Sequence, residues 1–114
     1  MKILLDHCVP APLCRHLRPH IVETAAKRGW DEKKNGDLLV AAEAAGFDCM
    51  ITNDKNIHYQ QNLSGRKIAI VLLSKQAWLF VQPHAQLIAD ALAQVTPGAF
   101  VEVEIPAPPN RPAK

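Results

Sequence analysis

The chain has 114 residues, of which 48% are hydrophobic and 21% charged, and its formal net charge is +2. This length favours a single domain with a modest core, and the composition is ordinary for a soluble globular protein. No apolar run approaches the roughly 20 residues that cross a bilayer, and the start of the chain turns acidic at Asp6, too early for a signal peptide. We therefore expect a cytoplasmic protein without a membrane partner.

Two further features of the composition bear on function. Lys and Arg are scattered along the chain rather than bunched, which is compatible with brief contact to a nucleic-acid backbone but does not predict it. The three cysteines, Cys8, Cys14 and Cys49, cannot all pair within one chain. In a reducing compartment we expect them to serve as small apolar residues rather than as disulfides.

The first part of the chain predicts two strands with a helix between them. A short buried strand is expected over residues 2–5, directly before Asp6, and a second strand over residues 21–25. Between the two, apolar residues recur at i, i+4 and i+8, the spacing of one helix face; they are Val9, Leu13 and Leu17.

The clearest helix begins at Asn35, which suits the N-cap position. Asp37 falls in its first turn, where a negative charge meets the positive end of the helix dipole. Strong helix formers fill residues 38–45, and Gly46 suits the position that follows the last helical turn.

The second half continues the alternation. Strands are expected over residues 47–52 and 67–73, with a helix over residues 54–63 between them. The later strand is almost continuously apolar, as in a central parallel strand that is covered on both faces. A loop that holds Trp78 follows, and then a helix begins at Pro83 with an inward face formed by Leu87, Ile88, Ala91, Leu92 and Val95.

The last part of the chain predicts a half-exposed edge strand over residues 99–105, where apolar and polar residues alternate. Residues 106–114 are proline-rich and lack large apolar side chains, so we expect one domain over residues 1–105 and then a disordered tail. The alternation of strands and helices predicts an α/β fold with a mainly parallel central sheet and helices on both faces.

In such a sheet the strand-to-helix junctions share one edge, which would bring Asp6 and Asp54 together. Asp37, at a helix N-terminus, could lie over the same edge. Carboxylates gathered in this way repel one another unless a cation lies among them. Mg²⁺ and Mn²⁺ favour oxygen ligands and keep some waters, which leaves positions for a phosphate. Such a metal can activate water against a phosphodiester. Asp54 also has a plainly structural interpretation, as the N-cap of the helix that follows it.

Several short blocks of the sequence, each weak alone, together resemble one family. They lie at residues 2–6, 29–30, 35–39, 45–48, 52–56, 59–63 and 66–71. On these blocks the chain resembles, over residues 1–104, the small stand-alone PIN-like proteins, relatives of the PIN-domain ribonucleases that include many bacterial toxin components. The resemblance implies a three-layer α/β/α sandwich and a metal-dependent endoribonuclease, of the type that serves as the toxin of toxin–antitoxin pairs, that hydrolyses RNA with metal-activated water.

The resemblance also implies the site. It gives catalytic and Mg²⁺- or Mn²⁺-ligating roles to Asp6, Asp37 and Asp54, with Thr52 and Asn53 as supporting residues. PIN-like proteins commonly carry a further acid where this chain has Asn56, a weaker ligand through its carbonyl oxygen. They often have an acid or amide where this chain has His7 followed by Cys8. These differences favour an alternative, a module that has lost catalysis and binds an antitoxin-like protein or a second copy of itself.

Polar and basic residues after Asp54 form a candidate surface for RNA. Single-stranded RNA is read through stacking and hydrogen bonds, and its phosphates attract basic side chains. The candidates are Lys55, His58, Tyr59, Gln61, Asn62 and Arg66. The structural alternatives are solvated charges, a solvated histidine and amides that brace neighbouring loops. We expect Trp30 and Trp78 to anchor loops on the core rather than to stack on bases.

Overall fold

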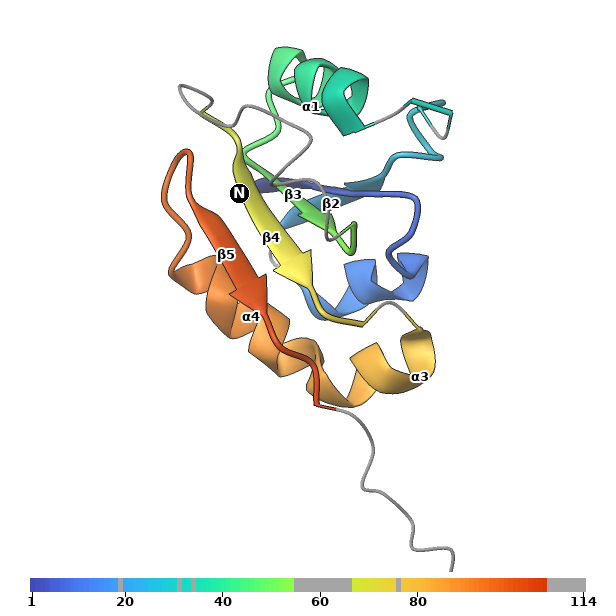
Figure 1. The fold of residues 1–114 in the computed structure, drawn as a ribbon, viewed down its shortest axis with the longest axis vertical. Coiled ribbons are helices and arrows are strands. Elements are labelled where there is room, and N and C mark those ends of the chain that lie inside the picture. The colour runs from blue at the N-terminus through green and yellow to red at the C-terminus, as the bar shows by residue number, and fades with distance from the viewer. Residues whose placement is uncertain (19, 31, 34, 55–66, 76, 107–114) are drawn as a thin grey trace, which may run out of the picture.

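The chain folds around a parallel sheet (Figure 1). The computed structural model describes residues 1–18, 20–30, 32–33, 35–54, 67–75 and 77–106. Within these residues the sheet has five strands, in the order β2-β1-β3-β4-β5. They are β1 (Lys2–Leu5), β2 (Ile21–Thr24), β3 (Cys49–Thr52), β4 (Ala69–Leu73) and β5 (Phe100–Val103). Every neighbouring pair is parallel, which confirms the predicted α/β fold and parallel sheet.

Apolar side chains cover both faces of the three central strands. All residues of β3 and β4 are buried, as are the last three of β1. Successive side chains point to opposite faces of a strand, so Leu5 and Ile51 join one buried cluster while Leu4 and Met50 join another. A strand that is covered on both sides has to be apolar at every position. This requirement explains why the continuous apolar runs of the sequence form the centre of the sheet.

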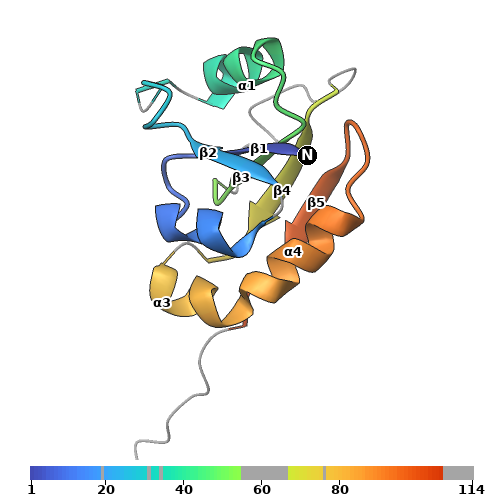
Figure 2. The same cartoon turned by 180° about the vertical axis from the view of Figure 1, so that it is seen from behind.

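Helices cover both faces of the sheet (Figures 1 and 2). Helix α1 (Asn35–Ala44) packs in the cluster of Leu4 and Met50. The 3₁₀ helix η1 (Ala11–His16), α3 (Trp78–Val81), the 3₁₀ helix η2 (Gln82–His84) and α4 (Ala85–Ala93) lie on the opposite face. Their buried side chains join the cluster of Leu5 and Ile51. The described residues therefore form a helical layer, a sheet and a second helical layer.

A glycine cap ends α1 and turns the chain towards β3. Gly46 has a φ of +86°, a left-handed conformation that favours glycine. Its N–H donates to the carbonyl of Glu43 at 3.1 Å, and the N–H of Phe47 donates to the carbonyl of Ala42 at 3.0 Å. These two bonds form a Schellman motif, which satisfies carbonyls left open at the helix end. The predicted role of Gly46 is confirmed.

The segment after β1 is helical, as predicted, but it forms a different type of helix. The spacing of Val9, Leu13 and Leu17 indicates an α-helix, whereas η1 is a short 3₁₀ helix. The helical segment spans six residues, and short connecting pieces of this kind commonly form 3₁₀ turns. The three apolar residues are nevertheless buried as expected.

The region before α4 also differs. The predicted loop around Trp78 contains the helix α3, whose Val81 is fully buried, and Pro83 lies in η2 rather than at the start of α4. Leu87 is 40% exposed, so its predicted inward position is wrong. Trp78 is half-buried, packs against the core and lies 5.4 Å from the ring of His16. Trp30 packs similarly against the other cluster, so the predicted anchoring of both tryptophans is confirmed.

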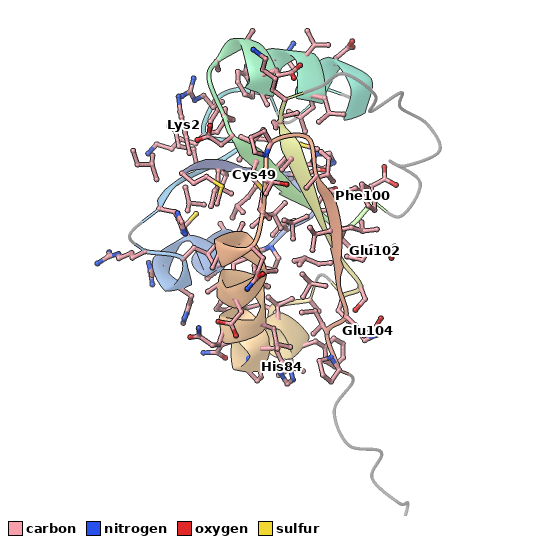
Figure 3. The ribbon with its side chains drawn as sticks, turned by 90° about the vertical axis from the view of Figure 1, so that its left-hand side faces the viewer. Lys2, Cys49, His84, Phe100, Glu102 and Glu104 are labelled. Atoms are coloured by element: carbon pink, nitrogen blue, oxygen red, sulfur yellow. The ribbon has the colours of Figure 1, made fainter. Side chains whose placement is uncertain are left out.

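Strand β5 forms one edge of the sheet, as predicted. Val103 is buried, whereas Glu102 and Glu104 are exposed, and Phe100 lies along the same side as these two acids (Figure 3). The predicted helix over residues 54–63 lies outside the described residues except for Asp54, and the predicted tail does so except for Pro106. Within the described ranges, no helix is both long enough and apolar enough to cross a membrane.

Candidate active site at the ends of β1 and β3

Asp6 is a buried carboxylate that follows β1 directly. Its exposed fraction is 2%. Its Oδ2 accepts a 2.7 Å hydrogen bond from the hydroxyl of Thr52, and its Oδ1 accepts a 2.7 Å bond from the backbone N–H of His7. A buried carboxylate is tolerated only where such partners replace water. The contacts therefore hold the group in one orientation at the end of the strand.

Thr52 connects Asp6 to Asp54. It is the last residue of β3 and is fully buried. A hydroxyl can donate one hydrogen bond and accept others, and here Oγ1 donates to Asp6 and accepts a 3.1 Å bond from the backbone N–H of Asp54. The register of the sheet supports this arrangement, because the N–H of Asp6 donates to the carbonyl of Ile51 at 2.9 Å. The junctions after β1 and β3 therefore meet at one edge, as the parallel sheet predicts.

His7 and Cys8 also belong to this site. The imidazole of His7 is 51% exposed, and its Nδ1 lies 2.9 Å from Oδ1 of Asp6. The sulfur of Cys8 accepts a 3.4 Å bond from the backbone N–H of Asn53 and lies 3.9 Å from Oγ1 of Thr52. Burial raises the pKa of the Cys8 thiol, and the negative charge of Asp6 adds to this effect.

From the sequence, His7 and Cys8 are differences from a family pattern and are not predicted as site residues. Their position directly after the strand-end Asp6 was the signal that could have placed them in the site.

The other residues predicted for the site differ in how the structure places them. Asn53 braces the edge, because its Nδ2 donates a 2.6 Å bond to the carbonyl of Leu73 at the end of β4. Asp54 is half-buried, and Asp37 is exposed in the first turn of α1. Asn56 and all six candidate RNA contacts lie outside the described residues; these contacts are Lys55, His58, Tyr59, Gln61, Asn62 and Arg66.

Asp6 and Asp54 follow neighbouring strands at this edge, and carboxylate oxygen is the donor that hard divalent cations prefer. Among the described residues, no group of three or more His, Cys, Asp or Glu side chains is placed to hold a metal ion. Mg²⁺ is commonly held by one or two carboxylates together with waters and substrate phosphates, so Asp6 and Asp54 are the residues that would hold a cation here. Oδ1 of Asp6 is engaged twice by His7, whereas Oδ2 accepts one hydrogen bond, from the hydroxyl of Thr52.

A pocket of about 460 Å³ opens beside Asp6. Asp6, His7 and Cys8 line it from the β1 side, Thr24 lines it at the end of β2, and Ala77 lines it just before α3. Asp37 does not line this pocket. The strand ends therefore form a concave surface that contains the buried carboxylate.

Comparison with models of protein families, with curated proteins and with solved structures gives no match for this chain. The residues and the geometry of the site are therefore what indicates its function.

Proposed function

We propose that this chain is a PIN-like ribonuclease that depends on Mg²⁺ or Mn²⁺ and acts as the toxin of a toxin–antitoxin pair. The observation that carries the proposal is the hydroxyl of Thr52, which bonds both the side chain of Asp6 and the backbone of Asp54. Two acids that lie far apart in the sequence are thereby held at one sheet edge, and one of them, Asp6, lines a pocket. This is where open α/β sheets place their ligands.

Each residue has a distinct part in the proposed reaction. Asp6 and Asp54 would hold the cation, Thr52 fixes the orientation of the Asp6 carboxylate, and Asn53 ties the edge to β4. A cation held by these residues would lower the pKa of a water and offset negative charge on the phosphodiester. Asp37 is proposed as a third ligand or base, with Asn56 as a weaker ligand.

The RNA strand is proposed to run along residues 55–66. The contacting side chains would be those of Lys55, His58, Tyr59, Gln61, Asn62 and Arg66.

The decisive experiment compares two conservative substitutions. Asp54→Asn keeps the size of the side chain but removes its charge, so it should abolish Mn²⁺-dependent cleavage of single-stranded RNA while circular dichroism stays unchanged. Asp90→Asn, on the exposed surface of α4, is the matched control and should cleave as the wild type does. Equal cleavage by the wild type and Asp54→Asn would remove the proposal.

One contact favours a second candidate, a binding module without catalysis. The ring of His7 lies 2.9 Å from Oδ1 of Asp6, which leaves fewer carboxylate lone pairs for a cation. In this case the contacts of Asp6 would serve the fold, and the surface would engage an antitoxin-like protein or a second copy of the chain. A ligand that binds only the folded state raises its stability. A module without a metal site should therefore gain no thermal stability from added Mn²⁺.

A further inference from the structure

The pocket beside Asp6 is built from three separate parts of the chain. Residues 6–11 run from the end of β1 to the first residue of η1, Thr24 and Ala26 lie at and just after the end of β2, and Ala77 precedes α3. The views in Figures 1 and 2 show η1 and α3 side by side below the end of β1. The volume of about 460 Å³ falls within the roughly 300–1,000 Å³ typical of pockets for small organic ligands.

Three of the lining residues, Asp6, His7 and Thr24, carry polar groups that a ligand could bond. The buried carboxylate of Asp6 is an acceptor, and the half-exposed ring of His7 has its Nδ1 against that carboxylate. No hydrogen bond from the described residues engages Nε2 of His7, so this nitrogen remains for a ligand. The hydroxyl of Thr24 accepts a 3.0 Å bond from the backbone N–H of Lys27, which leaves its own hydrogen to donate. These groups match the hydroxyls of a sugar, which both donate and accept.

The other lining residues, apart from Cys8, have small apolar side chains. They are Val9, Pro10, Ala11, Ala26 and Ala77, and we call them the apolar wall. None of them has a hydrogen-bonding side-chain group, so they can contact the flat face of a base but cannot distinguish base edges by side-chain bonds. Because Ala11, Ala26 and Ala77 are exposed, the wall is open to a ligand that enters from solvent.

From this mixed lining we propose that the pocket binds one unpaired nucleotide of an RNA strand, with the base against the alanines of the apolar wall and the ribose towards Asp6 and Thr24. The inference rests on the proposed ribonuclease function and specifies where its substrate is held. A base within a duplex is stacked and paired, so only a splayed nucleotide can enter a pocket of this size. The apolar wall accepts any base, and the site therefore selects unpaired RNA rather than a sequence.

The test uses substitutions that fill the pocket and leave the core unchanged. The double variant Ala26→Leu/Ala77→Leu adds apolar volume at two exposed wall positions, and the control Ala44→Leu/Ala93→Leu adds the same groups at exposed positions of α1 and α4. Binding of fluorescein-labelled hexauridylate and hexaadenylate is measured by anisotropy in EDTA, where metal-dependent cleavage does not take place. Leucine adds no aromatic ring on which a base could stack.

We expect the wild type and the control to bind both hexamers with similar affinity. The pocket variant should bind both hexamers at least about tenfold more weakly. Unchanged binding by the pocket variant, or no binding by the wild type, would overturn the inference. A strong preference for one hexamer would also contradict the apolar wall as the base contact. Because the assay contains no metal, it measures RNA binding independently of cleavage. The binding proposal and the catalytic proposal can therefore fail separately.

Discussion

Oγ1 of Thr52 donates a 2.7 Å hydrogen bond to Oδ2 of Asp6, and both side chains are buried. The bond joins the ends of β1 and β3, neighbours in the sheet. The same hydroxyl accepts the backbone N–H of Asp54. One buried hydroxyl thus sets the orientation of the carboxylate on which the proposed site depends.

Removing this hydroxyl should lower the stability of the protein. Thr52→Val keeps the shape of the side chain but leaves a buried carboxylate oxygen and the Asp54 N–H without this partner. We expect the free energy of unfolding to fall by about 1–3 kcal/mol, the usual penalty for an unsatisfied buried polar group. Urea denaturation measures this change.

The matched control is Thr24→Val. Its hydroxyl also accepts one backbone N–H, from Lys27, but in an exposed setting, where water can replace it. Thr24→Val should therefore be clearly less destabilising than Thr52→Val. Equal losses would show that burial of the Asp6–Thr52 contact adds nothing to stability.

The ring of His7 should compete with a cation for Asp6. Its Nδ1 lies 2.9 Å from Oδ1, so His7→Ala frees an oxygen lone pair. A net hydrogen bond of roughly 1 kcal/mol corresponds to about a fivefold change in affinity, and we expect Mn²⁺ to bind His7→Ala tighter by about this factor in calorimetric titration. His84→Ala, at the end of η2, should bind as the wild type does. Weaker binding by His7→Ala would instead make His7 a ligand.

The three cysteines are free thiols with different surroundings. Burial raises the pKa of Cys49 to about 12, and burial also raises the pKa of Cys8 and of Cys14, which are only partly buried. A raised pKa leaves less reactive thiolate at any pH below it. Alkylation by iodoacetamide should therefore be slow near neutral pH and accelerate above the ordinary thiol range, first at Cys8 and Cys14.

Cys49, with an exposed fraction of 0%, should remain unmodified until urea unfolds the protein. Mass spectrometry of peptides from the native and unfolded protein distinguishes the three sites. Labelling of Cys49 in the native protein as fast as Cys8 would contradict the buried position of β3.

The strands and the sheet edge could be predicted because their signals are local. The apolar runs of β3 and β4 leave few alternatives to buried parallel strands, and parallel strands bring Asp6 and Asp54 to the same edge. Gly46 indicated the end of α1 for a similar reason, since few residues other than glycine adopt its backbone conformation.

The rest of the site depends on contacts that no local pattern encodes. The contact of the Cys8 sulfur with Asn53 and Thr52 joins residues more than forty positions apart, and the pocket wall combines Ala26 and Ala77 from segments far apart in the chain. Helix α3 spans only four residues, too few for a helical period to show. Alanines on a pocket wall also have no sequence signal that separates them from alanines elsewhere.

The central claim is that Asp6 and Asp54 together hold one divalent cation, and crystals soaked in Mn²⁺ test it most directly. The account predicts an anomalous difference peak within roughly 2.0–2.5 Å of a carboxylate oxygen from each residue, the coordination range of hard divalent cations. A crystal with Mn²⁺ bound elsewhere, and no peak between Asp6 and Asp54, would contradict it.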